Sequence, residues 1–481
     1  MTKKKVQCML CALSAALLTG CAGNDAFLAQ QESITPQSWV ADVPVLESVP
    51  HGAADWWQAW HNPELTALIE QADRANTDIL TALANLRSAA ALADEATAAL
   101  FPTLDLSARG SSTRTNNRTT ESYQAGASYN WSLSLAGGNI AAKRAARHEA
   151  MAAHLTLEDT RILVAGEVAQ NYVALALARV KKEIAEKTLD NYRRALEIAR
   201  WNNEAGLTDR TELEQAVSNM QQARASIPLM DQSIAKYRNA LARLTGQSAA
   251  DIHLTAVDTV PSAPMTLAVA LPADTLRQRP DMRAAQMSLA AASERVYQAR
   301  SQWFPQLSIS GNLGTQAATV SALGASGTGL VTLIGALSMP LLNWGEQVSA
   351  TEQKLAALDK ARAQYTATLV GALEETENAL TAIRTAQTRE DALALARTSA
   401  ETAADLAMQQ YRAGLVDYQT VLNTQRTLLS AREDYQSNKA DLANGLITLY
   451  RALGGGWKPT EEIADELART EAPKQSRVSG S

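Results

Sequence analysis

Two stretches of the chain alternate strictly between apolar and polar residues. The odd-numbered residues from Tyr123 to Leu135 are apolar, and the residues between them are glycine or polar. The even-numbered residues from Leu104 to Ala108 alternate in the same way. A period of two indicates strands with one apolar and one polar face. We therefore expect a β-hairpin over about 103–135, with 110–121 as its polar loop.

A second hairpin is expected over about 305–341. Leu307, Ile309, Gly311 and Leu313 alternate there with serine and asparagine, whereas the return strand near 331–341 is apolar on both faces.

Long helical segments follow each hairpin. In 209–245 and again in 417–452 an apolar residue recurs at every seventh position: Leu213, Met220, Ile227, Ile234 and Leu241, then Val421, Leu428, Tyr435, Leu442 and Leu449. A strict seven-residue repeat indicates coiled-coil packing. Residues 139–204 contain no proline and are rich in helix formers, which predicts a single helix of roughly 95–100 Å.

The chain is an internal duplication. The sequence Ala205-Gly206-Leu207-Thr208-Asp209 has its counterpart 208 residues later in Ala413-Gly414-Leu415-Val416-Asp417, and Phe101-Pro102 recurs 203 residues later as Phe304-Pro305. A period this long indicates a duplicated domain. We expect repeat 1 over 55–250 (helix about 64–99, hairpin, long helix 139–204, helix 209–245), a linker over 251–264, and repeat 2 over 265–456 (helix, hairpin, long helix 346–412, helix 417–452). Residues 457–481 are expected to form a disordered tail.

Four strands are too few to cross a membrane alone. Membrane barrels begin at about eight strands, and open sheet edges are not tolerated in lipid. If the strands span a bilayer, two chains give eight strands and three give twelve, and a conducting lumen favours three or more. A soluble antiparallel sheet with one wet face would produce the same alternation, so that alternative stays open.

The N-terminus has the features of a secretory signal. Lys3, Lys4 and Lys5 precede an apolar run of about 13 residues, too short to span a bilayer as a helix. The run ends in Leu18-Thr19-Gly20-Cys21, which resembles a bacterial lipobox. That resemblance implies removal of residues 1–20, acylation of Cys21 and a lipidated extended segment over 21–54. An ordinary signal peptide with an incidental cysteine is the alternative.

The composition argues against several classes of functional site. Cys8, Cys11 and Cys21 are the only cysteines, and the five histidines lack metal-ligand spacing, so we expect no metal site. The net charge of −6 argues against nucleic acid as a partner. We find no phosphate-binding loop or nucleophile motif, and we expect neither an enzyme nor any cofactor beyond the covalent lipid on Cys21.

Several blocks resemble the outer membrane factors, the TolC-like channel subunits of tripartite efflux pumps, and especially the lipoprotein branch that serves resistance-nodulation-division transporters. These blocks are Asp55-Trp56-Trp57, Asn62-Pro63-Glu64-Leu65, Arg279-Pro280-Asp281-Met282 and Tyr411-Arg412-Ala413-Gly414-Leu415-Val416-Asp417-Tyr418. The resemblance implies a mixed α and β membrane protein. It would be a homotrimer whose twelve-stranded transmembrane β-barrel continues into a long periplasmic α-helical barrel of coiled coils, with an equatorial region.

The two Ala-Gly-Leu turns are the candidate functional sites. Gly206 and Gly414 stand where a helix ends with positive φ, and Asp209 and Asp417 stand where the next helix needs an N-cap. Capping alone explains these residues. The functional alternative makes the turns a periplasmic gate, in which Asp417, Leu415 and Tyr418 ring the pore and Arg412 or Arg210 pairs with the aspartates.

We therefore expect an outer-membrane lipoprotein of a Gram-negative bacterium that extends into the periplasm and contacts outer-membrane lipid. It would be the passive exit duct of an efflux pump for drugs or other small toxic compounds, opened by a periplasmic adaptor and an inner-membrane transporter. The alternatives are a channel for protein or peptide secretion and a fibrous envelope lipoprotein. The sequence does not identify the substrate.

Overall fold

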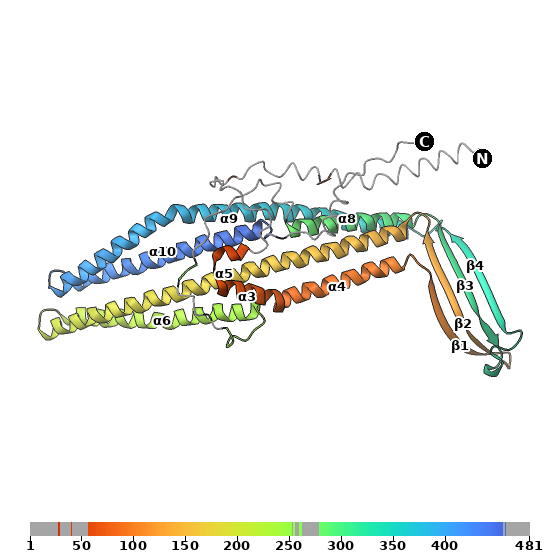
Figure 1. Cartoon of the computed structure of the whole chain (residues 1–481), viewed down its shortest axis with the longest axis horizontal. Helices are drawn as coiled ribbons and strands as arrows, with labels where there is room; N and C mark the ends of the chain where they lie inside the picture. Colours follow the sequence, from red (N-terminus) through yellow and green to blue (C-terminus); the bar gives the residue numbers. More distant parts are fainter. Residues whose placement is uncertain are drawn as a thin grey trace. The chain divides into compact units, whose positions relative to one another are not determined.

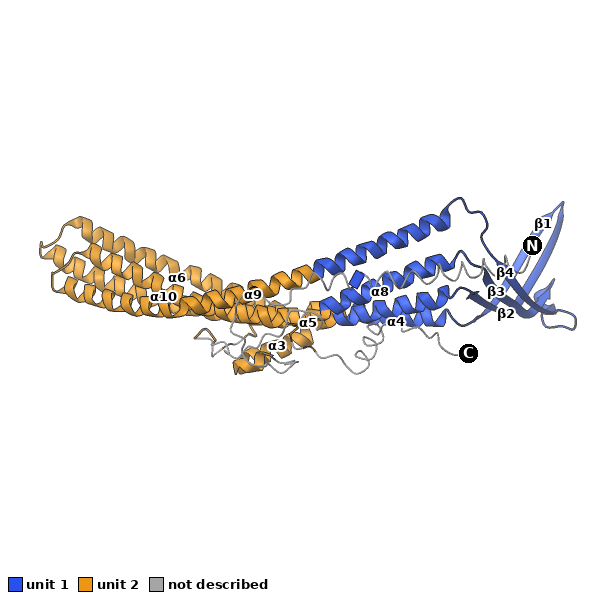
Figure 2. Cartoon of the chain, turned by 90° about the horizontal axis from the view of Figure 1, so that it is seen from above, with its two compact units in different colours: residues 1–34, 83–155, 281–368 blue, residues 35–82, 156–280, 369–481 orange. Residues whose placement is uncertain are grey.

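The computed structural model describes residues 27–28, 40, 56–252, 254, 259–261, 279–455 and 457. The expected signal peptide, Cys21, most of the 21–54 segment, most of the linker and the expected tail beyond Trp457 lie outside the described residues. The chain divides into two compact units (Figure 2): unit 1 comprises 1–34, 83–155 and 281–368, and unit 2 comprises 35–82, 156–280 and 369–481.

The order helix, two strands, long helix and shorter helix occurs twice along the chain (Figure 1), which confirms the duplication. Repeat 1 contains η1 (Trp56–Trp60), α3 (Pro63–Ala75), α4 (Thr77–Ala98), β1 (Thr103–Thr115), β2 (Arg118–Ser134), α5 (Gly138–Glu204) and α6 (Arg210–Leu244). Repeat 2 contains α8 (Pro280–Ser301), β3 (Gln306–Ala317), η2 (Val320–Ala322), β4 (Gly329–Ser338), α9 (Glu346–Arg412) and α10 (Tyr418–Ala452). The matched helices have equal lengths: 67 residues for α5 and α9, and 35 for α6 and α10.

Within the described parts of the chain, none of the helices combines the length and the apolar character needed to cross a bilayer.

Unit 1 contains one antiparallel sheet in the order β1-β2-β3-β4 (Figure 1). Its register brings the alternating apolar residues of all four strands to one face, because directly paired residues lie on the same side. This apolar face is formed by Leu104 and Leu106 of β1, Ala127, Tyr129, Trp131 and Leu133 of β2, Leu307, Ile309 and Leu313 of β3, and Val331, Leu333 and Leu337 of β4. It is not covered: Leu106 is 88% exposed and Leu333 is 76% exposed.

The first hairpin differs from the expectation at its tip. Residues 110–121 are not a loop, because β1 continues to Thr115 and β2 begins at Arg118, with Thr115 paired to Arg118. The whole connection is Asn116-Asn117, and both residues have positive φ, 47° and 66°. Asparagine tolerates this backbone region, which a two-residue hairpin turn requires at both positions. The polar composition therefore belongs to strand residues and not to a loop.

The helix expected over about 64–99 is broken at Asn76. Asn76 is buried and extended, with φ −67° and ψ 132°. Its Oδ1 accepts the N–H groups of Asp78 (2.8 Å) and Ile79 (3.2 Å), and its Nδ2 donates to the Leu244 carbonyl at the end of α6 (2.9 Å). The Asn76 side chain therefore caps the start of α4 and also binds the carbonyl at the end of α6. An N-cap residue has an extended backbone, so the helix is interrupted at Asn76.

Repeat 2 uses an arginine at the equivalent place. Arg279 Nη1 donates to the Ala452 carbonyl (2.7 Å), and Ala452 is the counterpart of Leu244. Arg279 Nη2 also contacts Glu375 Oε2 at 3.1 Å, and Glu375 Oε1 contacts Arg451 at 2.6 Å. These contacts fix the end of α10 against α9 within unit 2.

Candidate functional site at the helical turns

The turn between α5 and α6 is closed by backbone hydrogen bonds. The Leu207 N–H donates to the Asn202 carbonyl (2.8 Å), and the Gly206 N–H donates to the Asn203 carbonyl (3.0 Å). This is the Schellman arrangement, which needs a left-handed residue after the helix. Gly206 supplies it with φ +71°. Asp209 then caps α6, since its Oδ1 accepts the Glu212 N–H at 3.1 Å.

The turn between α9 and α10 repeats this geometry. The Leu415 N–H donates to the Gln410 carbonyl (2.8 Å), and Gly414 has φ +72°. Asp417 Oδ1 accepts from both the N–H (2.8 Å) and the hydroxyl (2.6 Å) of Thr420. These bonds from the Thr420 side chain and backbone lower the pKa of the Asp417 carboxyl, because they stabilise its charged form.

Near the turns, side-chain hydrogen bonds join the first helical hairpin to the second within unit 2. The Tyr411 hydroxyl at the end of α9 donates to Glu212 Oε1 in the first turn of α6, at 2.6 Å. Asn219 Nδ2 of α6 donates to the Tyr418 hydroxyl at 3.3 Å. Arg426 Nη2 lies 3.4 Å from Asn219 Oδ1 and extends the network along α10. We call this set of contacts the tip latch.

The tip latch rests on an apolar cluster shared by both hairpins. Its buried members are Tyr192, Ala195, Leu196, Ile198 and Ala199 of α5, Ala216 of α6, Tyr411 of α9, and Tyr418, Val421 and Leu422 of α10. Burial raises the pKa of the Tyr411 hydroxyl, and the neighbouring Glu212 raises it further. Burial also raises the pKa of Tyr418. Both tyrosines therefore stay protonated and able to donate a hydrogen bond at physiological pH.

The predicted gate residues do not form a single set. Asp417 and Arg412 are exposed, and Leu415 is 75% exposed, so all three lie on the surface of the single chain. Tyr418 is 1% exposed and packs inside the cluster, so it does not lie beside Asp417 on that surface.

The expected ion pairs of the aspartates are absent from the described residues. Arg210 contacts Glu214 at 3.3 Å instead, because an i,i+4 pair lies on one helix face. Arg412 forms no ion pair with any of the described residues.

The sequence did not single out Glu212, Asn219 or the pairing role of Tyr411. One signal was available: Tyr411 and Tyr418 stand at positions where repeat 1 has Asn203 and Arg210. Repeat 1 therefore has no tyrosine at either position that could make the matching contact.

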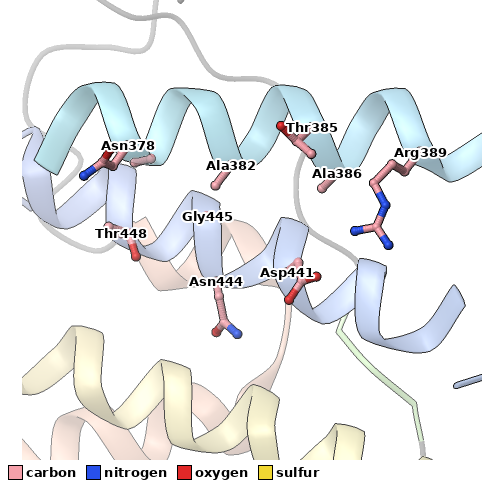
Figure 3. Close-up of a pocket in the computed structure, with 10 residues that line it drawn as sticks. Asn378, Ala382, Thr385, Ala386, Arg389, Asp441, Asn444, Gly445 and Thr448 are labelled. Carbon is pink, nitrogen blue, oxygen red and sulfur yellow. The ribbon is translucent and has the colours of Figure 1, made fainter. Parts of the chain in front are cut away.

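A groove of about 480 Å³ lies between α9 and α10 in unit 2 (Figure 3). Small residues line it, including Ala382, Ala386 and Gly445, and the Asn444 Oδ1 is buried without a hydrogen-bond partner. The repeat 1 counterpart of Gly445 is Tyr237. At this one position the groove has a much smaller side chain than repeat 1.

No group of three or more His, Cys, Asp or Glu side chains that could hold a metal ion occurs in the described part of the chain.

Sequence comparison places the chain among efflux proteins. The profile of the outer membrane efflux protein family matches residues 68–247 and 271–455. The pyoverdine export outer membrane protein OpmQ of Pseudomonas aeruginosa is 27% identical over 462 residues, covering 93% of this chain and 96% of that protein. The toluene efflux pump outer membrane protein TtgI of Pseudomonas putida is 28% identical over 415 residues, covering 83% and 87%.

Solved structures agree with this placement. The outer-membrane channel OprN superposes with a TM-score of 0.80 at 28% identity, covering 88% of this chain and 98% of OprN. The open state of the MtrE outer membrane channel of Neisseria gonorrhoeae gives a TM-score of 0.77 at 25% identity, covering 88% and 98%. The fold is therefore that of the TolC-like channels, and this chain belongs to the outer membrane efflux protein family.

Proposed function

We propose that this chain is the passive outer-membrane exit duct of a tripartite efflux pump, assembled as a homotrimer. A periplasmic adaptor and an inner-membrane transporter of the resistance-nodulation-division class would deliver the compounds and supply the energy. The duct itself carries out no reaction.

The sheet of unit 1 is the observation that carries this proposal. Its apolar face is exposed over four strands, and among the described residues no further strand pairs with β1 or β4. The shortest strand has 10 residues, and a tilted strand crosses a bilayer with about 9–11. Such a face is stable against lipid, provided that both open edges are paired.

If β1 of one copy pairs with β4 of the next, the backbone N–H and C=O groups at both open edges form hydrogen bonds. Two copies would give eight strands, and side chains fill the interior of a barrel that small. Three copies give twelve strands and leave room for solutes. The polar face, with Asp105, Ser128 and Asn130 among its residues, would then line water.

The helical turns supply the gate of this duct. The tip latch holds the two hairpins of one chain together, and the exposed Asp417, Leu415 and Arg412 are free to meet other copies. Three Asp417 carboxylates around the axis would repel anions and oppose close approach. Binding of the adaptor or transporter would open the duct by breaking the tip latch and moving one hairpin away from the other.

The N-terminus fits the same assignment. Acylation of Cys21 would attach each subunit to the outer membrane as a second anchor beside the barrel, which serves delivery and assembly more than conduction. Multiple acyl chains give stable attachment where one chain gives only marginal binding.

The relatives suggest the class of cargo. They are named for export of pyoverdine and efflux of toluene, so we propose small organic compounds as substrates of this chain.

Deletion of the gene in a strain that lacks redundant channels tests this function. Sensitivity should rise to a subset of a panel of antibiotics, dyes, solvents and metal salts, and a plasmid copy should restore resistance. Unchanged sensitivity to the whole panel would refute the efflux assignment, whereas a selective loss of a secreted protein would favour a secretion channel.

A further inference from the structure

Unit 2 contains a second hollow, of about 320 Å³, whose lining is rich in cations. It lies among α5, α9, α10 and the linker residues Thr259 and Val260. Four basic side chains line it, Lys187, Arg397, Arg432 and Lys439, together with two acidic ones, Glu183 and Glu401.

Two of the four cations are neutralised by their neighbours. Lys187 Nζ contacts Glu183 Oε1 at 2.5 Å, and Arg432 Nε contacts Glu401 Oε1 at 2.9 Å. Arg397 and Lys439 have no carboxylate partner within the part of the chain that the structure describes. The lining therefore keeps an excess of two positive charges.

The two unpaired cations converge on one aromatic ring. The Arg397 Cζ lies 4.4 Å from the centroid of the Tyr435 ring, and the Lys439 Nζ lies 4.9 Å from it. The face of an aromatic ring attracts a cation within about 6 Å of its centroid, so Tyr435 attracts both side chains. The Nε–H of Arg397 is buried and has no hydrogen-bond partner, although a buried charged donor is costly unless it is paired.

Repeat 1 shows that the fold does not need these cations. The counterpart of Arg397 is Leu189, which is 4% exposed, and the counterpart of Lys439 is Asp231. Asp231 is itself paired with Lys182 at 2.7 Å. The same helical positions thus carry an apolar residue and an anion in repeat 1, so packing alone does not account for the two cations.

We propose that this cavity is a binding site for an oxyanion, a carboxylate or a phosphate. The planar guanidinium of Arg397 presents a fork of N–H donors that matches two oxygens, and the Lys439 ammonium adds a point charge. The cavity volume is at the lower end of the range for small-molecule sites. The anion is either a free solute of the periplasm or an acidic side chain of a protein partner, and both present the same oxygens. This site does not depend on the proposed efflux role.

Calorimetric titration of the purified full chain in detergent tests the site. The probes are citrate, inorganic phosphate and a hexaglutamate peptide, each at constant ionic strength with chloride as the balancing anion. At least one probe should bind. Arg397→Leu and Lys439→Gln should each weaken its binding by about tenfold or more, because each removes hydrogen bonds to a charged group.

A matched control separates this site from general surface charge. Lys236 also lies over a tyrosine ring, 5.7 Å from the centroid of Tyr237, but it does not line the cavity. Lys236→Gln should bind the probe as the unmodified chain does. Arg397→Leu is expected to fold, since repeat 1 accepts leucine at this position, and thermal unfolding checks this.

Binding of citrate or phosphate assigns the site to a free anion, and binding of the peptide alone assigns it to a partner's acidic segment. The proposal is overturned if no probe binds, or if Arg397→Leu and Lys439→Gln bind as well as Lys236→Gln does.

Discussion

Gly414 and Gly371 belong to the same repeat, but alanine should have opposite effects at the two positions. Gly414→Ala should lower the free energy of unfolding, and Gly371→Ala should raise it. Gly414 has φ +72°, and a Cβ added to it would contact no other atom. Gly414→Ala should therefore introduce backbone strain alone and lower the free energy of unfolding by about 1–2 kcal/mol. Gly371 is an exposed interior residue of α9, also with open space. Gly371→Ala should therefore raise the free energy of unfolding by up to about 1 kcal/mol.

Denaturant unfolding of the two purified variants checks this pair. If both alanine variants shifted stability in the same direction, the left-handed conformation of Gly414 would not be what holds the turn.

The carboxylate of Asp417 should make the turn sensitive to acid. Its pKa in the folded chain lies below the ordinary value of 3.8 because Thr420 donates two hydrogen bonds to it. A lowered folded pKa means that the stabilisation is present above 3.8 and is lost as pH falls through the folded pKa. Asp417→Asn keeps a capping oxygen but does not titrate.

The difference in melting temperature between the unmodified chain and Asp417→Asn, followed from neutral pH to below 3.8, should shrink as the solution becomes acidic. A difference that stays constant over that range would show that the charge of Asp417 does not stabilise the turn.

At the residue scale, the sequence predicts only those roles that depend on neighbouring residues in the chain. Gly206, Gly414, Asp209 and Asp417 follow from turn and cap chemistry within about five residues. Tyr418 was misplaced because its burial depends on a hairpin about 200 residues earlier in the chain. The same holds for the bond between Tyr411 and Glu212, which are 199 residues apart.

At the element scale, periodicity located the strands and helices but not their interruptions. The break at Asn76 follows from a contact with the Leu244 carbonyl, which no local pattern contains. The continuation of β1 to Thr115 follows from pairing across a two-residue turn, whereas polar composition alone indicated a loop. The local pattern therefore locates the elements, but some of their ends, such as the break at Asn76, depend on a partner far away in the sequence.

The tip latch gives a prediction about the two helical hairpins. Tyr411→Phe removes the hydroxyl that binds Glu212 at 2.6 Å and keeps the buried ring. It should weaken the contact between the hairpins by about 1–3 kcal/mol, and on the proposed function it should raise the conductance of the channel in planar bilayers. Glu212→Gln should act in the same direction, and the double variant should add little.

Tyr450→Phe is the matched control, since Tyr450 is buried and its ring stacks on Trp56 at 5.2 Å. This variant should leave conductance unchanged. Equal conductance for Tyr411→Phe and Tyr450→Phe would show that the tip latch does not control channel opening.

At the scale of the whole molecule, matched residues of the two repeats make equivalent contacts, and some unmatched residues make contacts found in one repeat only. Glu167 and Arg243 in repeat 1 match Glu375 and Arg451 in repeat 2, and each pair joins a long helix to the end of a short one. Tyr411 and Arg397 have no such match: the corresponding residues are Asn203 and Leu189. The shared contacts build the hairpins, while the unmatched residues carry the tip latch and the proposed anion site.

The sheet gives a prediction that depends on the whole assembly. Leu333 and Ile334 are neighbours in the middle of β4 and both are exposed in the single chain, 76% and 53%. Leu333 pairs with Gly311 on the apolar face, and Ile334 pairs with Ser310 on the opposite face. If the apolar face meets lipid, Leu333→Arg should cost about 2–4 kcal/mol per chain, and Ile334→Arg, facing the water-filled lumen, should cost far less.

Fractionation of the outer membrane, with immunoblotting for assembled trimer, measures the difference. Leu333→Arg should be depleted from the outer membrane and Ile334→Arg should accumulate like the unmodified chain, because only the first places a charge in hydrocarbon. A sheet with water on both faces would tolerate both arginines equally. The comparison uses one strand, one substituent and adjacent positions, so differences in expression or local strand propensity cannot produce the expected asymmetry, whereas a lipid-facing surface requires it.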